Sequence, residues 1–120
     1  MRFMAIYKPG AENDAPPTEK EIADMGALIA EMTRKGVLIT TDGLQPSKKG
    51  ARVSVKNGTF TVTDGPFTET KELVAGFAII EVPSMAEAIE WTKRFLSVVG
   101  EGQSEIRLMH HVPAMVTFQG

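Results

Sequence analysis

Short apolar runs alternate along this chain with two longer stretches in which apolar residues recur every three or four positions. Runs of about five residues that end at Pro, Gly or Asp are typical of strands, and the three-to-four spacing is typical of helices with one buried face. The short runs predict strands at 2–8, 37–41, 73–82 and 105–112, with an extension over 114–118.

The two longer stretches are expected to be helices, and each opens on a capping box. In this motif a Ser or Thr accepts a hydrogen bond from the backbone three residues on, where a Glu stands. The pairs are Thr18 with Glu21 and Ser84 with Glu87. A glycine, which tolerates the conformation that ends a helix, follows each stretch, at Gly36 and at Gly100.

Between the two strand–helix–strand segments lies a predicted β-hairpin, with strands at 52–55 and 59–62. Asn57-Gly58 between them is a strong turn signal, because both residues accept the positive φ of a type I′ turn. In the second strand Phe60 and Val62 alternate with threonines. One face of the hairpin is therefore expected to be buried and the other to face water.

This order of elements predicts a ferredoxin-like α+β fold, βαβ-hairpin-βαβ, in a single domain over 1–120. Two helices can cover only one face of the sheet, yet the stretch Leu73 to Val82 carries apolar side chains toward both. A second copy, packed sheet against sheet, would cover the other face. The sequence therefore predicts a homodimer.

Composition narrows the chemistry that this chain can perform. Its 120 residues carry a net charge of −2 and include no cysteine, which excludes disulfide scaffolds, thiolate nucleophiles and iron–sulfur clusters. The charge balance gives no basic surface for nucleic acid or an anionic membrane. No signal peptide or membrane-spanning run is found, so a cytoplasmic protein is expected.

No cofactor or metal site is expected either. The chain has no glycine-rich phosphate loop and no dinucleotide fingerprint. His110 and His111 are neighbours on the predicted last strand, so their side chains would point to opposite faces and would not share one ion. One of them remains an alternative acid–base partner for a carboxylate.

Polar residues that follow the hairpin form the main candidate site. Asp64 either starts a turn at Asp64-Gly65-Pro66 or acts as a general base at the mouth of a cleft. Glu69 and Lys71 are the other candidate catalytic residues, with either Glu69 or Glu72 as a second carboxylate and Lys71 as an anion contact. The alternative for this charge run is a solvated loop.

The candidate substrate-binding residues flank the same region. Asp42 and Gln45 border a predicted turn, and Arg52 is an alternative anion contact. Phe67 and Glu72 complete the predicted substrate-binding residues around the loop. Trp91 is expected to pack at the edge of the second helix rather than to bind a ligand.

The segment Asp64-Gly65-Pro66-Phe67, followed by 68–72, resembles the DGPF signature of the YCII-related family. Gly36-Val37-Leu38, the turn at 42–46 and the order of the later elements fit the same pattern over about residues 2 to 110. The resemblance implies a dimeric ferredoxin-like α/β barrel with a cleft beside the hairpin. Relatives carry a first-helix histidine, suspected of forming an acid–base dyad with an aspartate, and 18–35 contains none.

Three hypotheses for the function follow. The first is a small-molecule enzyme that uses acid–base carboxylate chemistry in a pocket of the dimer. The second is a non-catalytic small-molecule-binding or regulatory module with the same pocket. The third is a scaffold that only associates. The missing histidine weighs against the first hypothesis, and the structured polar loop weighs against the third.

Overall fold

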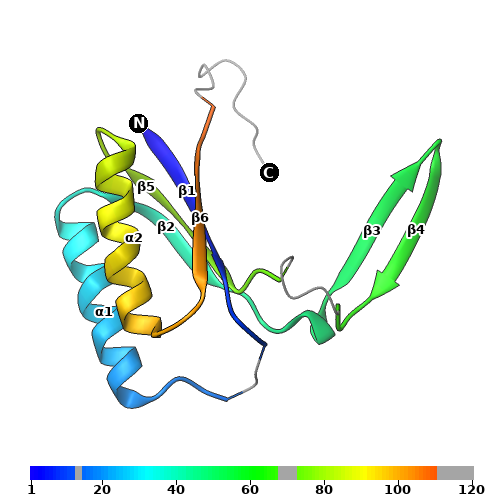
Figure 1. The fold of residues 1–120 in the computed structure, drawn as a ribbon, viewed down its shortest axis with the longest axis horizontal. Helices are drawn as coiled ribbons and strands as arrows, with labels where there is room; N and C mark the ends of the chain where they lie inside the picture. The colour runs from blue at the N-terminus through cyan, green and yellow to red at the C-terminus, as the bar shows by residue number, and fades with distance from the viewer. Residues whose placement is uncertain (13–14, 68–72, 111–120) are drawn as a thin grey trace.

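The computed structural model describes residues 1–12, 15–67 and 73–110 of the chain. Figure 1 shows a helix-covered sheet and a separate β-hairpin that stands away from it. In chain order the elements are β1 (Arg2–Lys8), α1 (Glu19–Arg34), β2 (Leu38–Gly43), the short 3-10 turn η1 (Ser47–Lys49), β3 (Ala51–Lys56), β4 (Thr59–Asp64), β5 (Gly76–Glu81), α2 (Met85–Val99) and β6 (Gln103–Leu108).

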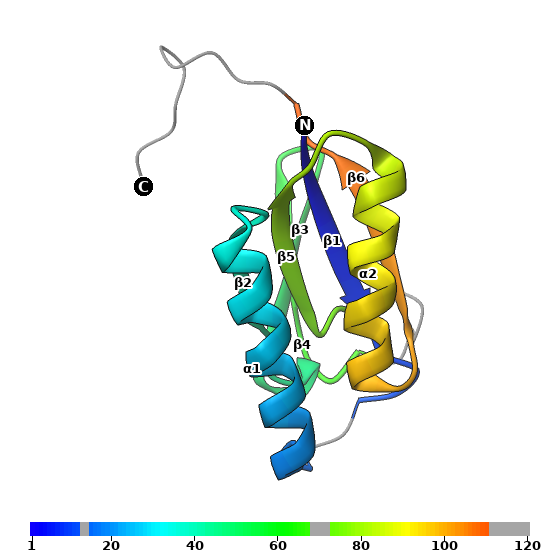
Figure 2. The same ribbon diagram turned by 90° about the vertical axis from the view of Figure 1, so that its left-hand side faces the viewer.

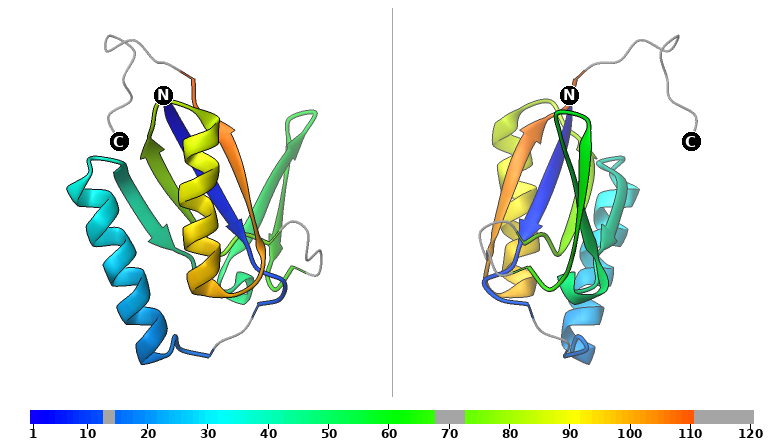
Figure 3. Two further views of the ribbon diagram at one scale, coloured as in Figure 1. Left: turned by 60° about the vertical axis from the view of Figure 1, so that its left-hand side comes forward. Right: turned by 90° about the vertical axis from the view of Figure 1, so that its right-hand side faces the viewer.

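Four strands form one antiparallel sheet in the order β2-β5-β1-β6. Both helices lie side by side on the same face of this sheet (Figures 2 and 3). The two central strands, β1 and β5, pair over the whole length of β5. This strand order with two helices on one face is consistent with the predicted ferredoxin-like fold.

In both predicted capping boxes, the hydrogen bond from the backbone N–H to the side chain of the capping residue is confirmed. The Thr18 Oγ1 accepts a hydrogen bond from the Glu21 N–H at 3.1 Å, and the Ser84 Oγ accepts one from the Glu87 N–H at 3.3 Å. Gly100 ends α2 in the left-handed conformation with φ 89°. The helix boundaries follow from these local contacts, so the sequence placed them closely. No helix in the described part of the chain is long and apolar enough to cross a membrane.

The core lies between the sheet and the helices. Phe3 and Ile80 are the largest fully buried side chains, from the two central strands, and Leu28 of α1 and Ala88 of α2 close over them. Successive residues of a strand point to opposite faces of the sheet. In β1 and β5, the residues next to Phe3 and Ile80 and every second residue from there therefore lie on the side away from the helices. We call that side the open face.

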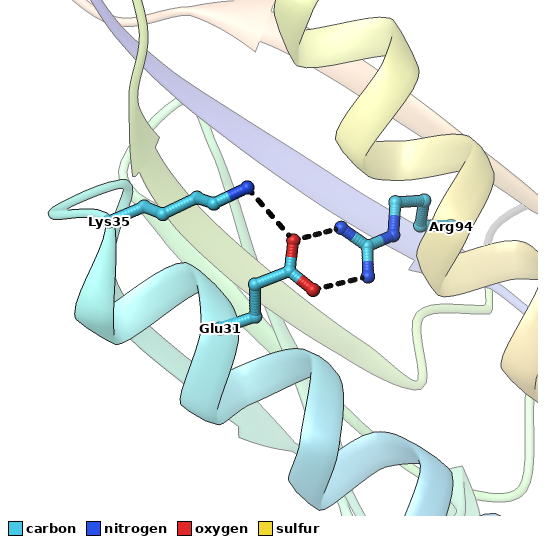
Figure 4. Close-up of polar contacts among 3 residues, drawn as sticks. All are labelled: Glu31, Lys35 and Arg94. Atoms are coloured by element: carbon cyan, nitrogen blue, oxygen red, sulfur yellow. Dashed lines mark hydrogen bonds and ion pairs between the residues drawn. The ribbon is translucent and has the colours of Figure 1, made fainter.

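A charged cluster joins the two helices outside this core (Figure 4). The Arg94 guanidinium donates two hydrogen bonds to the Glu31 carboxylate, at 2.6 and 2.8 Å, and Lys35 donates a third at 3.2 Å. Hydrogen bonds from Arg94 and then Lys35 lower the pKa of Glu31 to about 2. Both cations also lie over the ring of Trp91, at 5.0 and 5.5 Å. The cluster fixes α1 against α2.

The hairpin of β3 and β4, which we call the arm, is exposed along its whole length. Asn57 and Gly58 have φ values of 51° and 79°, as the predicted turn requires. Val53 pairs with Val62 and Val55 with Phe60, so these four apolar side chains share one face. They are 61–71% exposed. The expected apolar face exists, but the described chain leaves it in contact with water.

The base of the arm is fastened to the body by polar contacts. The Glu12 carboxylate accepts hydrogen bonds from the Ser47 N–H at 2.9 Å and from the Ser47 Oγ at 3.2 Å. The Phe67 N–H donates to the same Oγ at 3.0 Å. A Cβ on Gly65 would overlap the Ser47 carbonyl oxygen, so only glycine fits there. These contacts hold the arm in its outward direction.

Several predicted strand boundaries need correction. β5 begins at Gly76, three residues later than predicted, because the backbone enters the ladder only there, although Leu73 is already buried. Asp42 and Gly43 extend β2 rather than form a turn, since they pair with Phe77 and Gly76. β6 spans 103–108 instead of 105–112. The predicted extension over 114–118 lies outside the described residues.

Candidate functional site

A cavity of about 440 Å³ lies between the helices and the sheet. Its floor is formed by small residues of the central strands, where Ala5 pairs with Ala78 and Tyr7 with Gly76. Alanine and glycine project little from the sheet, so the helices above leave space uncovered. Cavities of 300–1,000 Å³ lined mainly by apolar side chains are the usual sites of small molecules.

Aromatic and thioether-bearing side chains line the walls. Tyr7 and Phe95 meet edge to face with their ring centroids 5.2 Å apart. Trp91, the only tryptophan of the chain, lines the same cavity, as does Met25 of α1. Rings and thioethers favour contact with another aromatic ring. The walls therefore suit a flat, largely apolar ligand.

Most hydroxyl groups of the lining already donate to the protein's own backbone. The Tyr7 hydroxyl donates to the Glu101 carbonyl at 2.8 Å, Thr41 to the Phe77 carbonyl at 2.9 Å, and Thr92 to the Ala88 carbonyl at 2.8 Å. Burial, and then the charge of Glu101, raise the pKa of Tyr7. The hydroxyl oxygens can still accept hydrogen bonds from a ligand, but their protons are already donated to backbone carbonyl groups.

Asp42 is the predicted site residue that the structure brings to this cavity. It pairs with Phe77, whose neighbours Gly76 and Ala78 face the helices. The alternation of strand residues therefore places the Asp42 carboxylate on the open face, and its backbone borders the cavity. Asp42 therefore borders the cavity with its backbone, and its negative charge lies outside the cavity.

The other described candidates gather at the base of the arm. The Arg52 guanidinium lies 4.2 Å from the centroid of the Phe67 ring, a cation–π contact. Asp64 ends β4 and is exposed, and Gln45 is exposed in the loop after β2. None of these four residues lines the cavity between helices and sheet. The structure therefore separates the predicted arm-base site from the observed cavity.

Glu69, Lys71 and Glu72 lie outside the described residues, as does His111. His110 follows the end of β6 and is exposed. Within 1–12, 15–67 and 73–110, no three His, Cys, Asp or Glu side chains are grouped so that they could hold a metal ion.

Sequence reasoning missed the cavity-lining residues because each of them also suits a core. The sequence predicts that Trp91 packs at the edge of the second helix, and the structure shows that it lines the cavity together with Phe95. One signal was present in the sequence: the core-facing positions of the central strands include Ala5, Gly76 and Ala78, which are too small to fill a layer between a sheet and two helices.

The fold and the site define the class: an α+β domain with a ferredoxin-like sheet and an apolar cavity beneath its helices. The chain belongs to the family with the YCII-related domain, whose model matches residues 1–107. This confirms the resemblance of the DGPF segment.

Among solved structures, the chain is similar to the 5-chloro-2-hydroxyhydroquinone dehydrochlorinase TftG from Burkholderia phenoliruptrix, determined in complex with 2,5-dihydroxybenzoquinone. The sequence identity is 17%, the TM-score is 0.46, and the alignment covers 93% of this chain and 96% of that one. No curated protein matches the sequence significantly.

Proposed function

We propose that this protein binds a small, largely apolar molecule with an aromatic ring in the cavity between its helices and its sheet. The observation that carries the proposal is the lining: small residues leave about 440 Å³ of space, and Tyr7, Trp91 and Phe95 line it together with aliphatic side chains. A well-packed core of this size would contain no such space, because protein interiors are packed as densely as organic crystals.

Trp91 makes the proposal directly testable, since the only tryptophan of the chain lines the cavity. Titration with 4-bromophenol, whose heavy atom quenches indole fluorescence, is expected to give saturable quenching. Ala5→Leu fills the cavity floor and should abolish saturation. Ala27→Leu adds the same bulk on the exposed side of α1 and should leave binding unchanged. Linear, unsaturable quenching in the wild-type protein would refute the proposal.

Acid–base chemistry on a small molecule at the base of the arm is the second candidate function, with Asp64, Glu69 and Lys71 as its predicted residues. The predicted anion contact Arg52 supports it, because its guanidinium lies at the same base, 4.2 Å from the centroid of the Phe67 ring. Asp64→Asn, Glu69→Gln and Lys71→Met should then retain probe binding but lose conversion of a compound that the wild-type protein transforms. Mass spectrometry of the incubated compound measures this. Equal conversion by all variants would remove these residues from the mechanism.

We also propose that the protein is a homodimer that buries the open face of the sheet. Four apolar side chains occupy the middle of that face, because Met4 pairs with Ile79 and Ile6 with Phe77. All four are half-buried, and both helices lie on the other side. Light scattering should give twice the mass of the chain, and the mass of a single chain would refute this part of the proposal.

A further inference from the structure

We infer that Ser104 donates the hydrogen bond that orients a bound molecule in the cavity, and that this molecule is uncharged and places a polar oxygen at the Ser104 end. This inference rests on the proposed binding of an aromatic molecule, and it names the residue that orients that molecule. Ser104 lies near the start of β6 and lines the cavity.

Strand pairing puts the Ser104 side chain on the helix-covered face of the sheet. Ser104 pairs with Tyr7 of β1, and two positions along the same strands Ile106 pairs with Ala5. Ile106 packs against the buried core beneath the helices, and strand residues two positions apart share a face. Directly opposite residues on one face lie about 5 Å apart. The Ser104 hydroxyl therefore stands on the cavity side of the sheet, beside Tyr7.

Ser104 differs from the other lining hydroxyl groups in its hydrogen bonds. Tyr7, Thr41 and Thr92 each donate to a backbone carbonyl group. In the described part of the chain, no protein group is hydrogen-bonded to the half-buried Ser104 side chain. A hydroxyl group carries one proton to donate and two lone pairs that accept. Ser104 is therefore the lining hydroxyl, within the described residues, whose proton is available to a bound molecule.

Tyr7 completes a small polar corner at the same end of the cavity. Its hydroxyl donates to the Glu101 carbonyl at 2.8 Å, so its oxygen can only accept from a ligand. The turn that carries this carbonyl packs closely on Tyr7, since a Cβ on Gly102 would come within 2.8 Å of the ring. A ligand oxygen in this corner can accept from Ser104, and a ligand hydroxyl can in addition donate to Tyr7.

The floor beside this corner provides room for a ring. On the same row across the sheet Tyr7 pairs with Gly76 and Gly76 with Gly43, and neither glycine has a side chain to occupy the space. Phe95 meets Tyr7 edge to face at the side of this space. A flat ring can therefore lie over the glycines with its oxygen substituent toward Ser104.

The charged side chains near the corner point away from the cavity, which favours an uncharged ligand. Lys8 and Glu105 follow Tyr7 and Ser104 in their strands, so they lie on the open face, where they pair at 3.3 Å. Asp42 also directs its carboxylate to that face, and no other Asp, Glu, Lys or Arg of the described residues lines the cavity. An ion would lose its hydration there without gaining a partner of opposite charge, which is costly.

Two probes of nearly equal shape isolate the hydrogen bond from Ser104. 4-Bromophenol and 4-bromotoluene differ in a hydroxyl group against a methyl group, and both quench Trp91 fluorescence through bromine. Ser104→Ala should weaken the binding of 4-bromophenol about tenfold, which is the usual effect of one hydrogen bond shielded from water. The dissociation constant of 4-bromotoluene should change less than twofold, because its methyl group makes no hydrogen bond.

Two further variants separate the hydroxyl group from the fold. Ser104→Thr keeps a hydroxyl at this position and should retain the binding of 4-bromophenol to within threefold. Ser97→Ala is the matched control, because Ser97 is exposed on α2 and donates to the Lys93 carbonyl. It should leave the dissociation constants of both probes unchanged. Weak binding by Ser104→Thr and Ser104→Ala alike, for both probes, would show that Ser104 acts only through packing and would overturn the inference.

The other outcomes separate the inference from the proposed function. Unchanged binding of 4-bromophenol by Ser104→Ala would show that the ligand oxygen lies elsewhere, and the cavity would remain a binding site. 4-Bromobenzoate, which is an anion at neutral pH, should bind the wild-type protein at least tenfold more weakly than 4-bromophenol, and equal affinity would overturn the uncharged ligand. Unsaturable quenching of the wild-type protein by both uncharged probes would contradict the proposed function and the inference together.

Discussion

The sheet and the arm are built from the same sequence pattern but differ in what covers them. In β1 and β5 the side chains that face the helices are buried or partly buried, and Phe3 and Ile80 are nearly inaccessible. In β3 and β4 the alternation is equally regular, yet Val62 and Phe60 remain more than half exposed. Alternation therefore identifies an apolar face, but the covering surface depends on how the element is connected to the rest of the chain.

The largest expected effect lies in the sheet. Ile80→Ala should lower the free energy of unfolding by about 2–5 kcal/mol, because it removes a fully buried side chain whose neighbours can collapse only in part. Urea denaturation measures the change. If Ile80→Ala lowered the free energy of unfolding by less than Gly65→Ala or Val62→Ala does, the assignment of the core to the layer between the sheet and the helices would be contradicted.

The next effect concerns the base of the arm. Gly65→Ala should cost about 1–3 kcal/mol, since the added Cβ would overlap the Ser47 carbonyl oxygen and force the base to shift. Gly10→Ala is the matched control, because a Cβ there meets no atom within 4 Å. Equal melting temperatures for the two variants would show that the base does not fix the arm.

A smaller effect is expected on the arm itself. In a free chain Val62→Ala should change stability by less than about 0.5 kcal/mol, as exposed substitutions do. If the arm docks on a second copy, the variant should instead cost about 1 kcal/mol, and the loss should depend on protein concentration. Thermal unfolding at several concentrations distinguishes the two cases. A concentration-independent, negligible change would count against docking.

Local signals account for the parts of the fold that the sequence predicted. Thr18 and Ser84 cap their helices through bonds to residues three positions on, and Asn57-Gly58 turns the chain within two residues. These contacts involve neighbours in the chain, so a single sequence contains them. The DGPF segment is also a local pattern of neighbouring residues, and it indicates the family from the sequence alone.

The remaining features depend on residues that are far apart in the chain. The direction of the arm is set by Glu12 bonding to Ser47, 35 positions on. The cavity depends on the combined volume of strand and helix residues, and each of these residues alone suits a core. The predicted arm-base site and the cavity are therefore distinct, which no local pattern indicated.

The smallest expected effect is pH-dependent and concerns the helix layer. The pKa of Glu31 is about 2 in the folded chain and 4.5 in the reference state. Its stabilising effect is therefore complete above pH 4.5 and is lost as the pH falls toward 2. Glu31→Gln should be less stable than the wild type at neutral pH, with the difference shrinking in acid.

Glu90→Gln is the control for this prediction, because the Glu90–Lys93 pair is largely exposed on both sides and should contribute little. Urea denaturation at neutral and at acid pH provides both comparisons. A Glu31→Gln difference that stays constant across this range would contradict the contribution of the Glu31–Arg94–Lys35 cluster.

Light scattering over a range of protein concentrations tests most directly whether a second copy covers the open face of the sheet. The account predicts a mass of two chains for the wild-type protein and of one chain for Ile79→Lys, which places a charge in the middle of that face. A mass of one chain for the wild-type protein at every concentration would contradict it.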